Sequence, residues 1–164
     1  MSPSSVSLNL TKCAFLVTSG NLLRQILSQE GIAMDPDKVK AILNAPAPSN
    51  AKALSRFLGQ IRWHNRMIRH LADFESPLHA AIQRLLFHWS STEDEAYQAL
   101  KLMLSHAPVV QPLVWSEPFH VFVDASDIAI GSALMQCTPP NWYWTVYYAS
   151  RRLSTAKKNY STTE

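Results

Sequence analysis

Residues 51–71 read Ala-Lys-Ala-Leu-Ser-Arg-Phe-Leu-Gly-Gln-Ile-Arg-Trp-His-Asn-Arg-Met-Ile-Arg-His-Leu, and this stretch predicts the helical part of the fold. At about 100° per residue, mostly apolar side chains fall on one half of the helical wheel and cations fall on the other half. The first half holds Ala53, Leu54, Phe57, Ile61, His64, Ile68 and Leu71, and the second holds Lys52, Arg56, Arg62, Arg66 and Arg69. The stretch has no acidic residue. It therefore predicts an amphipathic helix with one buried face and one basic face.

The basic face also contains Trp63, so a flat aromatic ring lies among the arginines. Exposed arginines beside such a ring suit phosphate contacts combined with base stacking. The candidate nucleic-acid contacts are Arg56, Arg62, Trp63, Arg66 and Arg69. Basic helix faces are also common as solvated surfaces. The residues alone leave open the alternative that the arginines only aid solubility and that Trp63 packs against a neighbouring element.

The residues before this helix predict a small antiparallel ribbon followed by a short helix. Alternating apolar residues run from Leu8 to Met34, and Ser19-Gly20-Asn21 gives a turn signal before the strand-like residues 22–27. Asp35 is a good N-cap, and Pro36 suits the first helical position.

The residues after the basic helix predict two further helices and then strands. The first helix is short and follows Ser76-Pro77, and the second opens at residues 91–95 with acids in its first turn, where the helix dipole favours them. Strands are expected at 119–123, 128–136 and 142–148, and a helix start at 161–164. Gly131 inside the second of these strands indicates a bulge or a close backbone approach. The fold class is therefore α+β.

The composition excludes several classes of protein. With 164 residues, 47% of them hydrophobic and 16% charged, the chain is too apolar and too weakly charged for a disordered tail. Its net charge of +3 permits a polyanionic partner without requiring one.

The cysteines and the N-terminus indicate an intracellular protein, in either cytoplasm or nucleus. Cys13 and Cys137 match no zinc spacing and are expected to be reduced thiols, and no signal peptide is recognisable. The uncharged residues 128–150 are interrupted by Pro139-Pro140-Asn141, which favours two strands and a turn over a membrane span.

Asp124 lies at the end of a predicted strand, on the same side of the pleat as Phe122. An aspartate in this place either bonds the backbone of a turn or ligates a metal. Spacing alone favours the turn, with Asp127 the more probable turn residue of the two.

Several motifs in a fixed order resemble the reverse transcriptase and ribonuclease H portion of the pol polyprotein of gypsy-type LTR retrotransposons. They are Leu8-Asn-Leu-Thr-Lys-Cys-Ala-Phe15, Glu30-Gly-Ile-Ala-Met-Asp-Pro-Asp-Lys-Val39, Phe57-Leu-Gly59, Ser76-Pro-Leu78, residues 119–126 ending in Val-Asp-Ala-Ser, Tyr148-Ala-Ser-Arg151 and Asn159-Tyr-Ser-Thr-Thr-Glu164. The resemblance implies the end of a polymerase palm at 8–34, thumb-like helices at 35–86, a connection at 87–116, and at 117–164 the N-terminal part of a ribonuclease H-like domain with a mixed sheet.

The same resemblance implies a parent activity of RNA-directed DNA synthesis and hydrolysis of RNA in RNA:DNA hybrids, both with Mg²⁺. Ribonuclease H chemistry uses two metal ions held by several carboxylates. Asp124 matches the first of these carboxylates by its place in Val-Asp-Ala-Ser. The helical glutamate of the family would fall two residues beyond Glu164, and the chain has no two adjacent aspartates for a polymerase site.

Because most of these carboxylates are missing, we expect a fragment of the polyprotein that is inactive alone. Asp124 would be a vestigial catalytic and metal-binding residue. The expected partners of the fragment are nucleic acid, as RNA:DNA hybrid or primer-template, and the remainder of a longer pol polyprotein. One alternative is a host-retained module that binds nucleic acid or protein without catalysis, and another is a non-functional, partly folded product. The family hairpin Phe-Leu-Gly-His appears here as Leu22-Leu23-Arg24-Gln25, and Tyr-Tyr-Arg-Arg-Phe appears as residues 63–67, Trp-His-Asn-Arg-Met.

Overall fold

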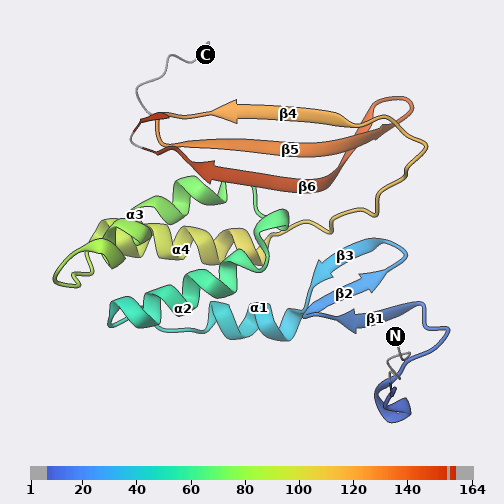
Figure 1. Ribbon diagram of the computed structural model, residues 1–164, viewed down its shortest axis with the longest axis horizontal. Coiled ribbons are helices and arrows are strands. Elements are labelled where there is room, and N and C mark those ends of the chain that lie inside the picture. Colours follow the sequence, from blue (N-terminus) through green and yellow to red (C-terminus); the bar gives the residue numbers. More distant parts are fainter. Residues whose placement is uncertain (1–6, 155, 158–164) are drawn as a thin grey trace, which may run out of the picture.

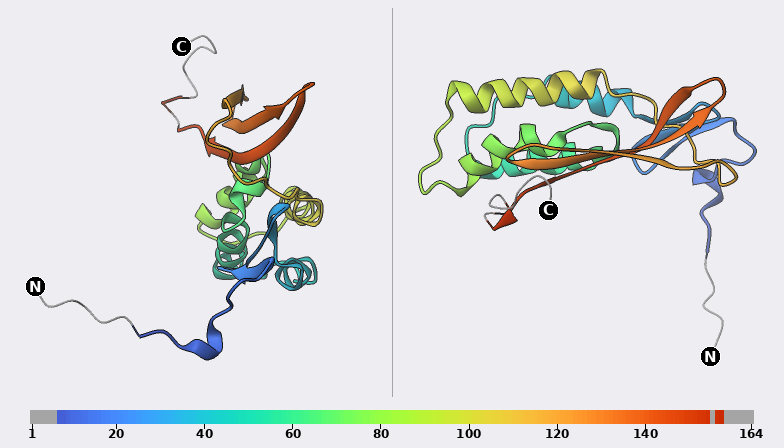
Figure 2. Two further views of the ribbon diagram at one scale, coloured as in Figure 1. Left: turned by 90° about the vertical axis from the view of Figure 1, so that its right-hand side faces the viewer. Right: turned by 90° about the horizontal axis from the view of Figure 1, so that it is seen from above.

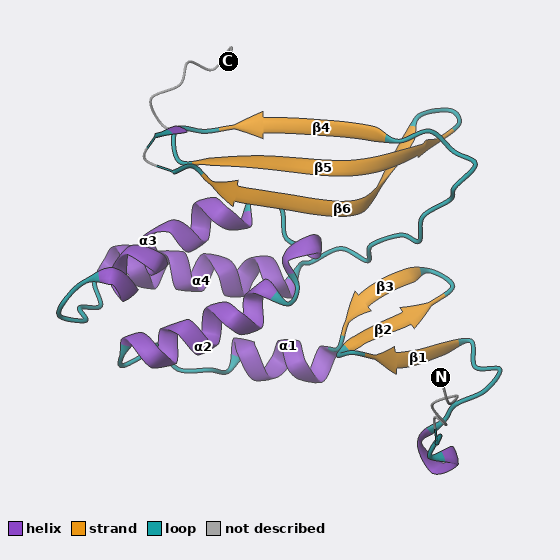
Figure 3. Ribbon diagram, viewed as in Figure 1, coloured by secondary structure: helices purple, strands orange, loops and turns teal. Residues whose placement is uncertain are grey.

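The computed structural model describes residues 7–154 and 156–157, which form two small sheets separated by a group of helices (Figure 1). The second sheet lies along one side of the molecule, α3 and α4 lie beneath it, and α1, α2 and the first sheet lie furthest from it (Figure 3). This arrangement confirms the α+β class. The expected helix start at 161–164 lies outside the described residues.

The first sheet is the antiparallel ribbon β1-β2-β3, with β1 at Ser19–Leu22, β2 at Gln25–Ser28 and β3 at Gly31–Met34. The ribbon was predicted correctly, but its first turn was not. Residues 19–21 lie inside β1, and the chain reverses at Leu23-Arg24, where both residues have positive φ. The segment before β1 is not a strand, because it holds a 3-10 turn at Leu10–Lys12.

Four helices follow in the expected order, and capping residues set two of their starts. They are α1 at Pro36–Leu43, α2 at Ala51–Arg62, α3 at Leu71–Gln83 and α4 at Ser91–Ser105, with a 3-10 turn η2 at Asn65–Met67. The Asp35 side chain accepts the Asp37 N–H at 3.0 Å, and the Asn50 side chain accepts the Ala53 N–H at 2.9 Å. Such side-chain acceptors replace the partners that the first turn of a helix lacks.

Two predicted helix boundaries are wrong. The helix expected over 51–71 ends at Arg62, where the chain continues through Trp-His-Asn, residues with weaker helix propensity than the preceding ones. The helix expected after Ser76-Pro77 begins earlier, at Leu71, and keeps Pro77 in its interior. A left-handed residue, His70 with φ of 52°, separates the two segments.

The hydrophobic core lies between the helices. All members of the main buried cluster fall between Ile42 and Leu104, and Leu54, Ile61, Leu78 and Leu100 have no exposed surface. Burying such a side chain stabilises the fold by about 1.5–3 kcal/mol. The second sheet contributes no residue to this cluster.

The second sheet is antiparallel, with β4 at His120–Ala125, β5 at Ala129–Thr138 and β6 at Trp142–Arg152. The uncharged residues 128–150 form β5, a turn and most of β6, so the prediction of two strands and a turn is confirmed. All pairings among these described strands are antiparallel, whereas the resemblance implied a mixed sheet. One face of the sheet packs on α3 and η2, and the long connector from α4 runs back past the first sheet to reach β4 (Figure 2).

Gln136 fixes the connector to the sheet. Its buried amide accepts the Val114 N–H at 2.9 Å and donates to the carbonyls of Val114, at 2.7 Å, and Glu117, at 3.1 Å. A buried amide side chain thus satisfies backbone groups that lack a strand partner. Among the described residues, no helix is long and apolar enough to cross a bilayer.

Candidate nucleic-acid interface and the Asp124 strand end

The five predicted contact residues do not form one continuous face. Arg56 and Arg62 lie on α2, Trp63 caps that helix, Arg66 lies in η2, and Arg69 falls between η2 and α3. The basic face expected over residues 51–71 is continuous only if these residues form one unbroken helix. Because α2 ends at Arg62, the later residues point in directions that a helical wheel does not describe.

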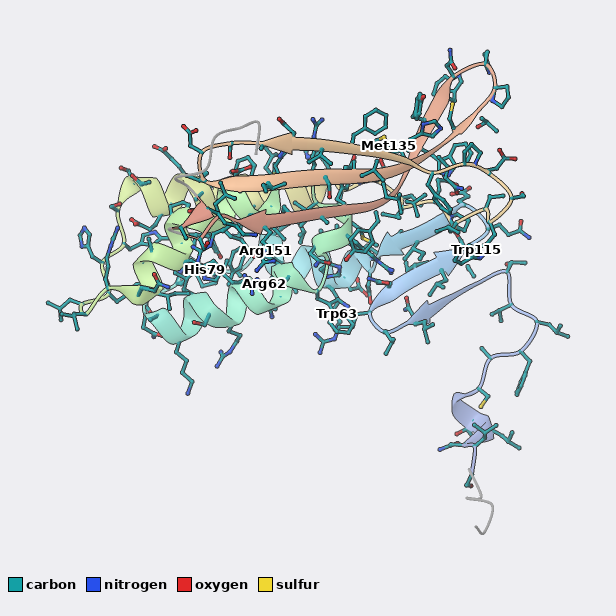
Figure 4. The ribbon with its side chains drawn as sticks, turned by 45° about the horizontal axis from the view of Figure 1, so that its top comes forward. Arg62, Trp63, His79, Trp115, Met135 and Arg151 are labelled. Carbon is teal, nitrogen blue, oxygen red and sulfur yellow. The ribbon has the colours of Figure 1, made fainter. Side chains whose placement is uncertain are left out.

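Arg62 forms an ion pair with the buried Glu75, while 60% of its own side chain stays exposed. Its Nε lies 3.4 Å from Oε2 of Glu75, and its Nη2 lies 3.2 Å from the His79 ring (Figure 4). Burial raises the pKa of the Glu75 carboxyl in spite of the Arg62 charge beside it. Burial also lowers the pKa of His79, assisted by the charges of Arg152 and Arg62.

Arg66 and Trp63 contact the first sheet. Arg66 donates from Nη2 to the side-chain oxygen of Gln25, and the Trp63 indole N–H donates to the Leu23 carbonyl at 3.1 Å. Trp63 nevertheless keeps 48% of its surface exposed. The alternative that Trp63 packs against a neighbouring element is therefore correct for its polar edge, and the rest of its ring stays accessible.

A groove of about 390 Å³ lies between the β1–β2 turn, α1 and α2, and we call it the hairpin groove. Three cations from three different elements line it, namely Arg24, Lys38 and Arg56, together with Trp63. None of these cations has an ion-pair partner among the described residues. Sequence reasoning missed Arg24 and Lys38, because they are distant from α2 in the chain and carry no pattern of their own.

His64 lies at the wall of the hairpin groove and is 3% exposed. Burial lowers the pKa of its ring, and the nearby charges of Arg24 and Arg66 lower it further. The imidazole therefore stays neutral at neutral pH, and the positive charge of the groove comes from its arginines and lysine.

Asp124 lies within β4, and 73% of its side chain is exposed. Its one close ionisable neighbour among the described residues is His70, whose Nε2 lies 3.9 Å from Oδ2. Asp124 is one of the residues that line a groove of about 560 Å³, together with Arg69, His70, Phe122, Met135 and Tyr143.

The donors around Asp124 do not fit a pair of metal ions. The described residues contain no cluster of three histidine, cysteine, aspartate or glutamate side chains arranged to hold a metal. Two Mg²⁺ ions need several converging carboxylate oxygens. The described residues supply one such carboxylate at this strand, so we derive no chemical step from a metal here.

His70 joins the helices to the second sheet, a role that the sequence did not indicate. Its Nδ1 lies 3.6 Å from Asp73, and its ring packs against Gly131 so closely that a Cβ at that position would lie 2.7 Å from Nδ1. The close backbone approach expected at Gly131 is thus confirmed, and its partner is a residue of the inter-helix turn. Ser126, and not Asp127, fixes the β4–β5 turn, because its hydroxyl oxygen accepts the Ala129 N–H at 3.1 Å.

Comparison with known proteins gives consistent matches. Residues 89–164 match the family described as the RNase H-like domain found in reverse transcriptase. The Pol polyproteins of the Drosophila melanogaster transposons opus and 297 are 30% and 31% identical to the whole chain. The Tf2-3 polyprotein of Schizosaccharomyces pombe is 26% identical over 98% of the chain. The chain spans only 17%, 15% and 12% of the lengths of these three relatives.

Solved structures show the same fold. The foamy viral protease-reverse transcriptase in complex with dsDNA matches 94% of this chain with a TM-score of 0.81 and 18% identity, and the match covers 32% of that chain. The same viral protein in complex with an RNA/DNA hybrid matches with a TM-score of 0.80, covering 21% of that chain. The chain is therefore a homologue of the region of retrotransposon Pol polyproteins that contains the RNase H-like domain of reverse transcriptase.

Proposed function

We propose that the chain binds a nucleic-acid duplex through the hairpin groove and does not cleave it with its described residues alone. The single observation that carries this proposal is the convergence of Arg24, Lys38 and Arg56 beside the exposed ring of Trp63. Unpaired cations in a groove suit backbone phosphates, and an accessible indole suits a base or a sugar. Related structures that hold dsDNA and an RNA/DNA hybrid support a duplex as the ligand.

The helix surface beside this groove is open to a close ligand. Gly59 lies on the exposed face of α2, and a Cβ at that position would have no atom within 4 Å. A glycine inside a helix costs about 1 kcal/mol relative to alanine. No packing requirement in the fold accounts for that cost, and the absent side chain lets a ligand approach the helix backbone.

In this proposal the regions keep the limits given by the resemblance. Residues 8–34 act as the end of a polymerase palm, 35–86 as the thumb-like duplex-binding helices, 87–116 as a connection and 117–164 as the start of the ribonuclease H-like domain. Asp124 would supply one ligand of a Mg²⁺ centre, and the other carboxylates would come from outside the described residues. The remainder of a Pol polyprotein is thus the proposed protein partner.

Binding is tested by fluorescence anisotropy with a labelled RNA:DNA hybrid over a salt series. We expect affinity to fall steeply with salt, and the double variant Lys38→Ala/Arg56→Ala to flatten the log–log slope by about one for each lost phosphate contact. Lys52→Ala is the matched control, because Lys52 is an exposed cation of α2 that does not line the groove. Binding that is independent of salt and of both groove residues would refute the proposal.

The Arg62 and Arg66 positions are poor probes of binding, because their side chains have partners inside the fold. The lack of cleavage is tested separately by incubating the chain with labelled hybrid and Mg²⁺. We expect intact hybrid. Cleavage that disappears in Asp124→Asn would contradict the proposal.

A further inference from the structure

The second sheet has an open edge at β4. This strand pairs with β5 on one side, and no described strand lies on its other side. Helix α3 packs under β5 and β6, so β4 is the strand of this sheet that lies furthest from the helices (Figure 1). Val121, Phe122 and Val123 are 65%, 49% and 66% exposed. An apolar strand is therefore accessible along its edge and from both of its faces.

The hydrogen bonds of the sheet show which backbone groups face this edge. The Ser126 N–H donates to the Ala129 carbonyl at 2.9 Å, and hydrogen-bonded pairs recur at every second residue of an antiparallel ladder. In the β4–β5 register, Phe122 is thus hydrogen-bonded to β5, whereas Val121 and Val123 lie at the positions between. The N–H and C=O groups of Val121 and Val123 therefore point away from β5, towards the open edge.

The β4 edge lacks the usual features that prevent edge strands from pairing. These features are lysine, proline and bulges. Residues 120–125 contain neither lysine nor proline, and the register shift described for this sheet lies between β5 and β6. By contrast, the β6 edge is partly occupied, because the Gln111 N–H of the connector donates to the Thr145 carbonyl at 3.1 Å. The open edge at β4 is thus the one that can accept another strand.

The sequence of β4 is complementary to itself when two copies pair antiparallel about Phe122. His120 then lies opposite the partner's Asp124, and Val121 lies opposite the partner's Val123. Each Val121–Val123 pair exchanges two backbone hydrogen bonds, because these residues direct their backbone groups outward. The two copies of Phe122 lie opposite each other at a position without such bonds, where side chains approach most closely. One register therefore pairs imidazole with carboxylate and apolar side chains with one another.

Other registers fit less well. Opposite residues of an antiparallel pair lie on the same face, so the two-fold axis passes through a residue, and the neighbouring choices are Val121 and Val123. The axis at Val121 would place Pro118 opposite Asp124, and proline has no N–H to donate. The axis at Val123 would place Phe122 opposite Asp124. Neither choice gives the carboxylate a donor.

The side chains that would meet are already held in place within one copy. His120, Phe122 and Asp124 share one face of β4. The Tyr143 ring makes edge contacts with His120 and Phe122, with ring centroids 5.2 and 5.7 Å apart. Oδ2 of Asp124 lies 3.9 Å from His70 Nε2, and the side chain is 73% exposed, which leaves Oδ1 open to a donor. Side chains fixed in this way lose little freedom on association.

We propose that two copies of this chain associate through antiparallel β4–β4 pairing centred on Phe122, which joins their second sheets into one. The pairing is isologous, so each copy uses its open edge once and assembly stops at two. The interface is only one strand wide, so the dimer is weak, with a Kd of about 10–100 µM. The inference is independent of the proposed function, because the hairpin groove lies at α1, α2 and the first sheet, away from β4 (Figure 1).

Sedimentation equilibrium without nucleic acid tests the dimer over about 5–500 µM chain. We expect the mean mass to rise from 18.4 kDa towards twice that value. Val123→Lys places a charge at the edge, opposite the partner's Val121, and should weaken the dimer about tenfold or more. Ile130→Lys is the matched control, because Ile130 is 40% exposed on the same face of the sheet but lies in the central strand β5. It should dimerise as the wild type does.

Two variants at one position test the register. His120→Lys sets an opposite charge against the partner's Asp124 on both sides of the axis, whereas His120→Asp sets a like charge there. We expect the Kd of the His120→Asp dimer to be about tenfold or more above that of the His120→Lys dimer. Equal Kd values would refute the pairing centred on Phe122.

Three further outcomes would overturn the inference. In the first, the wild type stays at 18.4 kDa at the highest concentration, which leaves the edge to another occupant such as a further part of a Pol polyprotein. In the second, a folded Val123→Lys variant dimerises as tightly as the wild type. In the third, the mass grows beyond that of a dimer. Thermal melting at low concentration checks the folding of each variant, and the two His120 variants carry the test if Val123→Lys is unfolded.

Discussion

The β1–β2 turn places two side chains in a backbone conformation that suits glycine. Leu23 and Arg24 have φ values of 50° and 65°, and the left-handed region costs a residue with a Cβ about 1–2 kcal/mol. Turns of this kind favour Asn-Gly or Asp-Gly. Arg24 stands where the family hairpin Phe-Leu-Gly-His has glycine, and it lines the hairpin groove.

We therefore expect Arg24→Gly to raise the free energy of unfolding by about 1 kcal/mol. The measurement is urea denaturation followed by circular dichroism. Arg24→Ala is the control, because it removes the same cation but keeps the Cβ and its strain. Equal stability changes in the two variants would show that the charge, and not the backbone, is responsible.

Gly131 permits the contact between His70 and the second sheet. A Cβ at this position would lie 2.7 Å from His70 Nδ1 and 3.0 Å from Cε1, so the ring would have to move away from Asp73 and Asp124. We expect Gly131→Ala to destabilise the fold by about 1–3 kcal/mol. In the double variant His70→Ala/Gly131→Ala the two effects should not add, because the clash is gone. Additive free energies in this double-mutant cycle would contradict the assigned contact.

At the scale of the element, α4 depends on a buried glutamate at its start. Glu93 is 1% exposed, and its carboxylate accepts the Ser90 N–H at 2.9 Å and also the Ser90 hydroxyl. Arg84 Nη2 lies 3.0 Å from its other oxygen. The Ser90 hydroxyl is the main cause that lowers the pKa of Glu93, and the ordinary value is 4.5.

This lowered pKa has a consequence for stability. A carboxyl whose pKa is lower in the folded state stabilises the fold above its unfolded pKa, and that stability is lost as the pH falls through the folded pKa. We expect Glu93→Gln to reduce the free energy of unfolding at neutral pH by about 1–2 kcal/mol. The difference from the wild type should shrink below pH 4.5, which urea unfolding at several pH values measures. A difference that is constant with pH would exclude the charged form as the cause.

The position at which helix α2 ends decides which partners the arginines at and after its end can reach. The first half of the helix expected over 51–71 was predicted correctly, with Leu54, Phe57 and Ile61 buried. Its end at Arg62 was not predicted, and this end sends Arg62 to Glu75 and Arg66 to Gln25. A helical wheel describes directions only inside one continuous helix. The basic stripe therefore contained real exposed cations but grouped them wrongly.

At the scale of the whole molecule, the helices and the second sheet differ in how they are held. The main core lies wholly between Ile42 and Leu104, whereas β4 is an edge strand exposed along most of its length. Few side-chain hydrogen bonds are described between the helices and the second sheet. In one of them the Ser126 hydroxyl donates to Asp73 Oδ1 at 3.0 Å. Local opening is easiest where few apolar contacts are lost.

We therefore expect amide hydrogen exchange to be slowest in peptides from residues 54–104 and at least about tenfold faster in residues 120–125. Mass spectrometry after timed deuterium labelling measures both. Stronger protection of β4 than of α4 without ligand would contradict the division into a stable helical core and a weaker sheet.

The sequence by itself determined the elements, their order and the family. Periodicity, capping residues and turn residues act over a few neighbours, so they predicted the first sheet, α1, α4 and the strands of the second sheet from local chemistry. The ordered motifs identified the polyprotein region for the same reason, since they are local patterns.

Only the tertiary structure decided which side chains share a site. Arg24, Lys38 and Arg56 meet in one groove, and His70 meets Gly131, because packing of the core brings together segments that are far apart in the chain. The sequence alone does not show whether a cation faces solvent or a buried carboxylate. The partners of Arg62, Arg66 and Asp124 were therefore not predictable from spacing, because they depend on how the helices end and on which face of the sheet they cover.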